Sequence, residues 1–172
     1  MRKYGVRAAE HKDVETISSI AMESWRHTYG SIYPIEVIDR FVSSAYSHEN
    51  LHASIAKDSG NPMRLFHVAI DQDKRIVGYS QSIQDPVMKC VFELARIYAL
   101  PGSIGSGVGT TLLDYLFSRS TSICELSAWV EERNGFGRKF YEKHGFRISD
   151  EREEDLFGYK TREVKYTLTV HS

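Results

Sequence analysis

The sequence is poor in cysteine and proline, and it has no long apolar run. Its 172 residues include 2 cysteines and 4 prolines. No stretch approaches the roughly 18 uninterrupted apolar residues that a membrane-spanning helix requires. The first residues, Met1 to Arg7, also lack the apolar core of a secretory signal peptide. We therefore expect a cytoplasmic protein without a membrane partner.

Neither sign of charge is in excess. The chain has 22 basic and 23 acidic residues, which gives a formal net charge of −1. Proteins that bind nucleic acid usually carry a basic excess gathered on one face. We therefore expect no nucleic-acid partner.

The two cysteines, Cys90 and Cys124, each lie in an apolar run with the composition of a strand. Isolated cysteines of cytosolic proteins are most often buried thiols, because reducing conditions keep disulfides from persisting there. We expect two buried free thiols, and neither a disulfide nor a catalytic nucleophile.

Length and hydrophobic periodicity predict one α/β domain over residues 1–172. Hydrophobic residues make up 41% of the chain, which is enough for a substantial core. We expect helices from Asp13 to about Tyr29, after Pro34, and over 110–117 and 134–144. Strands are expected over 4–8, 65–70, 75–83, 91–100, 123–130, 146–152 and 163–170. This order indicates a mixed sheet flanked by helices.

A glycine-rich turn at 102–109 separates the apolar run 91–100 from the helical pattern at 110–117. The first backbone N–H groups of a helix have no partner within the helix, and its dipole favours negative charge at that end. Glycines let a phosphate group approach the backbone closely. The sequence therefore predicts a ligand that carries phosphate groups.

Single residues of this turn exclude two common phosphate-binding loops. A Walker A loop ends in Gly-Lys-Ser/Thr, whereas Gly107 is followed by Val108 and Gly109, and the loop has no lysine. The dinucleotide fingerprint that begins at Gly105 would require glycine where Thr110 stands. A different phosphate ligand is needed.

The turn Ile104-Gly-Ser-Gly-Val-Gly109 resembles the pyrophosphate loop of the GCN5-related N-acetyltransferases, Gln/Arg-x-x-Gly-x-Gly/Ala, with Ile104 in place of Gln or Arg. Downstream, the segment from Asn134 to Phe146 is similar to the family's Asn-x-x-Ala-x-x-Phe-Tyr-x-x-x-Gly-Phe, with Gly137 in place of Ala. The two matches span about residues 91 to 146. The resemblance implies a mostly antiparallel mixed sheet flanked by helices, and acetyl-CoA or CoA as cofactor.

The resemblance also implies where the cofactor binds. The backbone of strand residues would pair with the pantetheine amides, the loop would hold the pyrophosphate, and Asn134 would bind the pantetheine arm. Asn134 equally suits a helix N-cap. The implied cofactor-binding residues are Ile97, Tyr98, Ala99, Ile104, Gly105, Ser106, Gly107, Val108, Gly109, Thr110, Asn134, Arg138 and Lys143.

Acetyl transfer to an amine needs a base for the amine and an acid for the leaving thiolate. By the family's pattern Glu93 would be the base, directly or through water, and Tyr141 the acid. The alternatives are a Glu93 carboxylate that only pairs with a cation such as Arg96, and a Tyr141 that only packs in the core. The chain lacks a Gly-x-Ser-x-Gly elbow and a histidine partner for either cysteine, so we expect direct transfer in a ternary complex.

The acceptor is expected to contact the segment from Trp25 to Tyr33, which resembles the acceptor-side hairpin of the family. The candidate substrate-binding residues are Trp25, His27, Tyr29 and Tyr33. Trp25 and Tyr29 would otherwise be packing residues between two helices. The run from Ser24 to Tyr29, followed by Pro34, looks like that of PaiA-like polyamine acetyltransferases and of relatives that act on small amines or protein N-termini. Assembly is expected to be a monomer or a homodimer.

Two other functions remain open. The missing Gln or Arg at Ile104 would suit a non-catalytic acyl-CoA-binding regulator of the same fold. The run His48-Glu-Asn-Leu-His52 matches the His-Glu-x-x-His pattern of zinc peptidases, in which Glu49 would be the base. No later segment offers a convincing third ligand, and Ser47 is placed to cap the helix, so we expect no metal.

Overall fold

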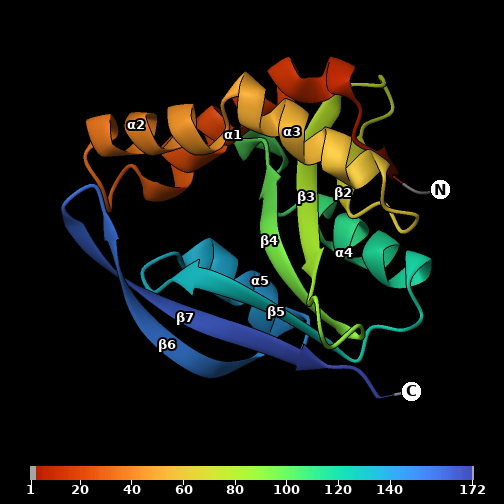
Figure 1. The fold of residues 1–172 in the computed structure, drawn as a ribbon. Helices are drawn as coiled ribbons and strands as arrows, with labels where there is room; N and C mark the ends of the chain where they lie inside the picture. Colours follow the sequence, from red (N-terminus) through yellow and green to blue (C-terminus); the bar gives the residue numbers. More distant parts are fainter. Residues whose placement is uncertain (1–2, 172) are drawn as a thin grey trace.

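The computed structural model describes residues 3–171 as one seven-stranded sheet with helices on both faces (Figure 1). The strand order is β1-β2-β3-β4-β5-β7-β6. The strands are β1 (Gly5–Ala8), β2 (Phe66–Ile70), β3 (Ile76–Gln84), β4 (Val91–Ala99), β5 (Glu125–Glu131), β6 (Arg147–Leu156) and β7 (Tyr159–Thr169). The helices are α1 (Val14–Tyr29), α2 (Ile35–Ala45), α3 (His48–Ser59), α4 (Val108–Arg119) and α5 (Gly135–Lys143).

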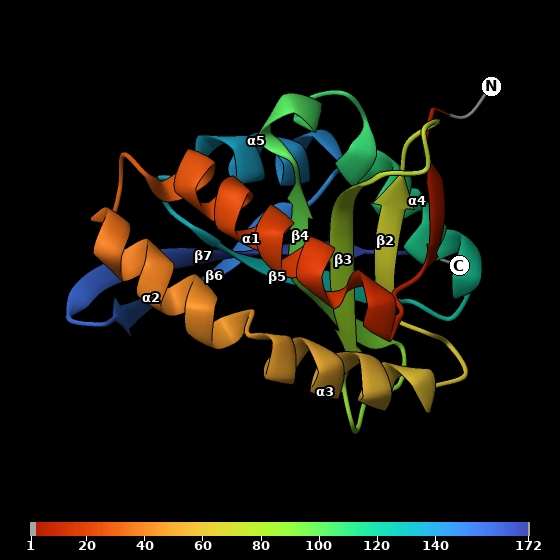
Figure 2. The same cartoon turned by 90° about the horizontal axis from the view of Figure 1, so that it is seen from above.

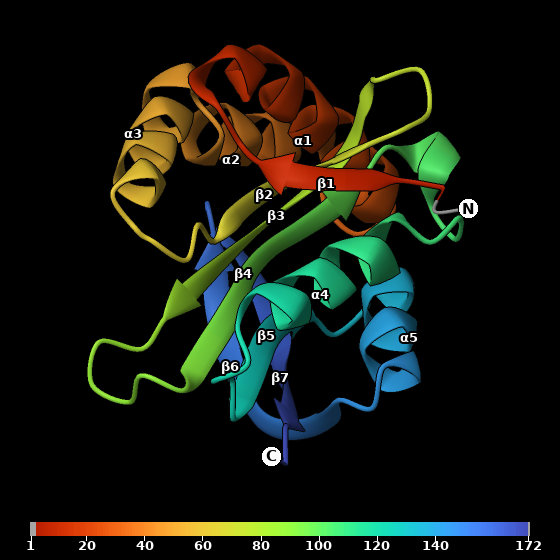
Figure 3. The same ribbon diagram turned by 90° about the vertical axis from the view of Figure 1, so that its right-hand side faces the viewer.

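The helices form two layers, with α1, α2 and α3 on one side of the sheet and α4 and α5 on the other (Figure 3). Seen from above, α1 crosses the strands, and α2 and α3 follow one another beside it (Figure 2). The first layer buries Ile17, Ile38, Leu51 and Ile55 against the sheet residues Phe66 and Tyr79. The second buries Leu113, Leu116 and Tyr141 against Phe92, Leu126 and Tyr166. The sheet core is therefore covered on both faces.

Local signals in the sequence set the helix ends. Helix α1 ends before Gly30, and α2 starts directly after Pro34, as the sequence predicted. Ser47 Oγ accepts a hydrogen bond from the Asn50 N–H at 3.1 Å and caps α3. The expected order of elements is confirmed, and β6 and β7 are longer than predicted. No helix of residues 3–171 is long and apolar enough to cross a membrane.

Strands β4 and β5 are parallel neighbours, whereas the other adjacent strands are antiparallel. Their register runs only from Val91 with Glu125 to Glu93 with Ser127. Beyond Glu93 the two strands diverge, as Figure 1 shows. The side of β4 that faces β5 is therefore an open edge from about Leu94 onward, with backbone groups free to pair with a ligand.

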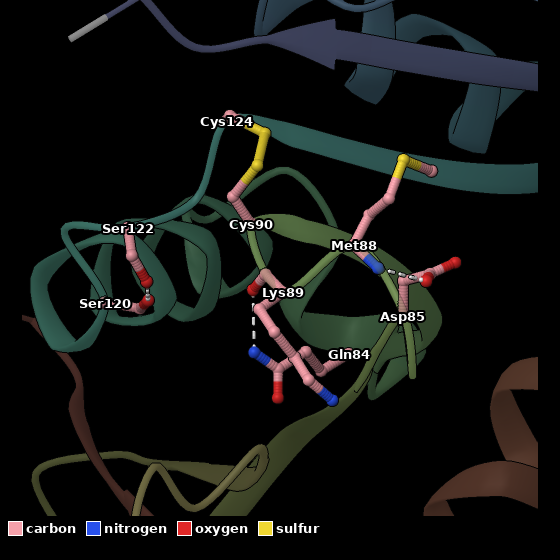
Figure 4. The surroundings of a disulfide bond; sticks show 8 residues. All are labelled: Gln84, Asp85, Met88, Lys89, Cys90, Ser120, Ser122 and Cys124. Carbon is pink, nitrogen blue, oxygen red and sulfur yellow. Dashed lines mark hydrogen bonds between the residues drawn. A yellow bond between two sulfur atoms is a disulfide. The ribbon is translucent and has the colours of Figure 1, made fainter.

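The prediction of two free thiols is wrong, because Cys90 and Cys124 form a disulfide (Figure 4). These residues directly precede Val91 and Glu125, the first register pair of β4 and β5. Their Cα atoms lie 5.1 Å apart, and the Cys124 N–H donates to the Cys90 carbonyl at 2.8 Å. The parallel pairing, which sequence spacing does not reveal, places the two cysteines side by side. The bond closes the narrow end of the gap between β4 and β5.

Candidate active site

The gap between β4 and β5 opens into a cavity of about 550 Å³, called here the cofactor cavity. Its walls are the second half of β4, the loop before α4, the end of β5, α5 and the last turns of α1. Most of the predicted cofactor-binding residues line it, namely Ile97, Tyr98, Ala99, Ile104, Gly105, Ser106, Gly107, Val108, Gly109, Thr110, Asn134 and Lys143. The structure therefore brings together segments that are distant in the sequence.

The loop before α4 has the geometry of an anion-binding cradle. Gly105 and Gly107 have φ values of 77° and 99°, a left-handed conformation that other residues adopt only at a cost. Gly107 is the residue directly before α4, so the first-turn N–H groups of α4, which lack partners within the helix, face the loop. The Ser106 hydroxyl holds the loop through hydrogen bonds to the Tyr4 hydroxyl at 2.7 Å and the Ser103 carbonyl at 2.5 Å. The cradle is thus preformed.

Asn134 caps α5 and also lies at the wall of the cofactor cavity. Its Oδ1 accepts from the Gly137 N–H at 2.9 Å and caps α5, while its Nδ2 donates to the Tyr29 hydroxyl at 3.3 Å at the cavity wall. A Cβ at position 137 would lie 2.8 Å from the Asn134 Nδ2. The glycine at this position therefore leaves room for the orientation of the Asn134 amide.

Tyr141 lies on α5 with its ring stacked on Tyr166 and its side chain lining the cofactor cavity. Burial raises the pKa of the Tyr141 phenol well above its usual range, with a smaller contribution from Tyr29. The phenol therefore keeps its proton at neutral pH, as an acid must before the transfer. Tyr141 therefore packs in the core and also lines the cofactor cavity.

The basic side chains on α5 and directly after it are distributed differently from the prediction. Lys143 lines the cofactor cavity, and so do Lys139 and His144, which sequence reasoning missed. Arg138 does not line it. The Arg138 guanidinium donates from Nε to the Tyr166 hydroxyl and from Nη1 to the Glu132 carbonyl, both at 3.1 Å. Lys139 and Lys143 are four residues apart and therefore lie on one side of α5, whereas Arg138 is turned away from both. Helical periodicity is thus a signal that separates them.

His144 connects the two helices that border the cavity. Its Nε2 lies 3.0 Å from the Thr110 Oγ1 on α4, and its Nδ1 lies 2.8 Å from the Phe140 carbonyl. Since a carbonyl only accepts, Nδ1 donates and Nε2 accepts from the threonine hydroxyl in the neutral ring. This contact fixes the mouth of the cradle relative to α5.

A second cavity of about 360 Å³, called here the acceptor cavity, lies on the α1–α2 side. Aromatic side chains from the two helices and their connection form one wall: Trp25, Tyr29, Tyr33 and Phe41. Side chains from β5, β7 and β6 form the floor, including the carboxylates Glu131, Glu154, Asp155 and Glu163 and one cation, Arg152. Tyr29 lines both cavities. The tyrosine therefore stands where the two spaces approach each other.

Three of the four predicted substrate-binding residues, Trp25, Tyr29 and Tyr33, line the acceptor cavity. His27 lines neither cavity, because it points outward from α1 and stacks on Phe136, with ring centroids 6.0 Å apart. Packing between helices is also observed, since the Trp25 ring lies 4.4 Å from those of both Tyr29 and Phe41. The hairpin of β6 and β7 covers this region, and Arg40 of α2 contacts the Phe157 ring at its tip.

Glu93, the predicted base, lies on the paired part of β4 with its side chain exposed, and it lines neither cavity. The alternative, an ion pair with Arg96, is not present within residues 3–171. Arg96 instead donates to the Ala45 carbonyl at 3.2 Å and lies over the Tyr46 ring. A base role for Glu93 therefore requires water molecules between its carboxylate and the acceptor nitrogen.

The His-Glu-x-x-His run lies at the start of α3, away from both cavities. His52 stacks on His11, with their Nδ1 atoms 2.8 Å apart. Across the described range 3–171, no three His, Cys, Asp or Glu side chains are grouped so that they could hold a metal ion. A third ligand for a peptidase-like zinc site is therefore missing in this part of the chain.

Comparisons with known proteins agree with this geometry. Residues 62–148 match the family model of the acetyltransferase (GNAT) domain. A spermidine N(1)-acetyltransferase from Thermoplasma acidophilum is 31% identical over 160 residues, which cover 92% of this chain and 97% of that protein.

Solved structures give the same result. PaiA N-acetyltransferase from Thermoplasma acidophilum, solved with coenzyme A, superposes with a TM-score of 0.79 at 26% identity, covering 98% of this chain and all of that one (100%). A putative acetyltransferase from Salmonella typhimurium, solved with acetyl-CoA, has a TM-score of 0.74 at 17% identity, covering 99% and 96% of the two chains. The second match shows the fold alone.

Proposed function

Because the chain belongs to the GNAT acetyltransferase family, we propose that it transfers the acetyl group of acetyl-CoA directly to a primary amine. The observation that carries this proposal is the pair of cavities that share Tyr29. One has an anion cradle at its end, and the other has a carboxylate floor that suits a cationic amine. Donor and acceptor can then occupy the enzyme together.

The residues of the cofactor cavity fit acetyl-CoA. Gly105, Gly107 and the first turn of α4 would hold the pyrophosphate, with Lys143 and Lys139 near its charge. The open edge of β4 at Ile97–Ala99 would pair with the pantetheine amides. When bound, acetyl-CoA supplies an acetyl thioester that an amine can attack.

The chain's own residues supply the proton transfers. The Tyr141 hydroxyl is protonated at neutral pH and would donate its proton to the departing sulfur. Asn134, held by its bonds to Gly137 and Tyr29, would orient the pantetheine arm. Glu93 is the proposed base for the amine, through water. Since Cys90 and Cys124 are joined in a disulfide, neither offers a free thiol for an acyl intermediate.

A polyamine such as spermidine is the proposed acceptor class. The 31% identical relative is named a spermidine N(1)-acetyltransferase, and the acceptor cavity has four carboxylates against one guanidinium. Other small amines and protein N-termini are the alternatives.

A cytoplasmic location and a monomer or homodimer remain predictions, which cell fractionation and sedimentation would test.

The test of the proposed function is calorimetric titration with CoA and acetyl-CoA, followed by thiol release against a panel of amines. We expect binding, and turnover with spermidine. Binding without turnover on any amine would favour a non-catalytic acyl-CoA-binding regulator. No binding of CoA at all would overturn the assignment of the cofactor cavity.

A further inference from the structure

The floor of the acceptor cavity contains two carboxylates that face each other. Glu131 at the end of β5 is directly opposite Glu163 on β7 in the antiparallel register. Like charges in directly opposite positions destabilise a sheet. Glu131 is also only 5% exposed, which makes its charge costly to bury. An arrangement that lowers stability in this way suggests a role in binding.

Each of the two carboxylates has one arginine partner. Glu131 accepts from the Arg133 Nε at 3.0 Å, and Glu163 accepts from the Arg152 Nη2 at 2.6 Å. The Arg152 Nε also lies 3.1 Å from Glu154, and its guanidinium covers the Trp129 ring at 4.1 Å. Arg152 is thus a cation of the protein itself, positioned on the floor of the cavity.

Two residues that line this cavity each have a buried polar atom without a hydrogen-bond partner among residues 3–171. The two atoms are the Thr161 Oγ1 and the Trp25 Nε1, and both side chains belong to residues that are more than nine-tenths buried. Thr161 lies two residues from Glu163 on β7, so the two side chains share one face of the sheet. An unpaired buried hydroxyl on the same face as Glu163 leaves a place for a hydrogen-bond partner that a ligand can supply.

We propose that Glu131, Glu163 and Thr161 form a subsite for an ammonium group of the acceptor, and that Arg152 competes with the acceptor for Glu163. An ammonium group has three N–H donors, which match two carboxylates and one hydroxyl. The aromatic wall with Trp25 adds attraction for a cation. This inference rests on the proposed function and adds a requirement: the acceptor carries a second positive charge besides the amine that is acetylated.

The test compares two acceptors with the same four-carbon chain, 1,4-diaminobutane and butylamine, at saturating acetyl-CoA. We expect a lower KM for the diamine in the unmodified enzyme. Glu131→Gln should raise the diamine KM by about tenfold or more, with little change for butylamine. Arg152→Gln should lower the diamine KM by about threefold. Equal KM changes for both acceptors, or a diamine KM raised by Arg152→Gln, would overturn the proposal.

A matched control and a milder variant keep the test decisive. Arg162→Gln removes an ion pair with Glu151 from the other face of the same hairpin and should leave both KM values unchanged. Thr161→Val removes only the unpartnered hydroxyl, so it tests the subsite even if Glu131→Gln does not fold, and it should raise the diamine KM about threefold.

Binding of spermidine, measured by calorimetry on the same variants, reads the subsite without turnover. If the unmodified enzyme binds spermidine but acetylates no amine, the subsite is upheld and the proposed function fails. If it acetylates butylamine and diamine with the same KM, the proposed function holds and the subsite is wrong.

Discussion

The cofactor cavity and the acceptor cavity are built from different parts of the chain. The cofactor cavity combines stretches that offer backbone groups, namely the open edge of β4, the glycine loop and the first turn of α4, with side chains of α5. The acceptor cavity consists of side chains, with aromatic rings on α1 and α2 and charges on β5, β7 and β6. Tyr29 belongs to both.

Because of this difference, the two cavities suit different parts of the reaction. Backbone N–H groups and a helix dipole bind the phosphates and amides that every acyl-CoA carries. Side chains on three strands can change one by one without disturbing those groups. We expect substitutions in the first cavity to alter the use of the cofactor, and substitutions in the second to alter the choice of amine.

The largest effect is expected at Tyr141. Tyr141→Phe should lower kcat by about a hundredfold or more, because a general acid contributes roughly that much. The affinity for CoA should stay within about twofold, since the ring remains. Because the pKa of the phenol is raised, wild-type activity should persist to alkaline pH without loss of this acid. Thiol-release assays from pH 6 to 10 measure kcat and its pH dependence. An unchanged kcat in Tyr141→Phe would show that Tyr141 is only a packing residue.

The glycine cradle tests the cofactor side alone. In Gly107→Ala the unbound loop should relax out of the left-handed conformation, and restoring it on binding costs about 1–2 kcal/mol, so the Kd for CoA should rise about five- to thirtyfold. Gly102→Ala is the matched control, because Gly102 has no positive φ and open space around its Cα. The KM for the amine should not change. Equal weakening by both substitutions would contradict the cradle.

The predicted base gives a smaller effect that depends on pH. Glu93→Gln should lower kcat/KM about threefold to tenfold at pH 7, because most of a free alkylamine, with a pKa of about 10.4, is still protonated there. The deficit should shrink as the pH approaches 10, where the amine loses its proton without help. A deficit that is the same at every pH would exclude a base role, as would no deficit at pH 7.

The disulfide should matter for stability and hardly for catalysis. Replacing Cys90 and Cys124 by alanine should lower the free energy of unfolding by about 3 kcal/mol, because the bond closes a loop with a sequence separation of 34 residues. The register pairs from Val91 to Glu93 remain, so CoA affinity should change less than twofold. Urea unfolding with and without reductant measures the free energy of unfolding, and calorimetry measures the affinity for CoA. A large loss of affinity would show that the bond shapes the cofactor cavity.

Much of the cofactor side was predictable because its signals are local. The glycine loop, the cap at Asn134 and the position of Tyr141 follow from residues close together in the sequence. Details that depend on rotation about a helix were not predicted. Lys139 lines the cofactor cavity and Arg138 does not, although the two residues are adjacent. The prediction that His27 binds the substrate is wrong for the same reason, because His27 points outward from α1 and lines neither cavity.

The sequence by itself determined the order of elements and the glycine-rich loop before α4, since hydrophobic periodicity, caps and glycine conformations act within a few residues. Only the tertiary structure decided that Cys90 meets Cys124, and that Glu131, Thr161 and Glu163 line one cavity together with Trp25. Those contacts depend on the register between strands that are distant in the chain. A register is set by the packing of the whole sheet, which no short stretch of sequence contains.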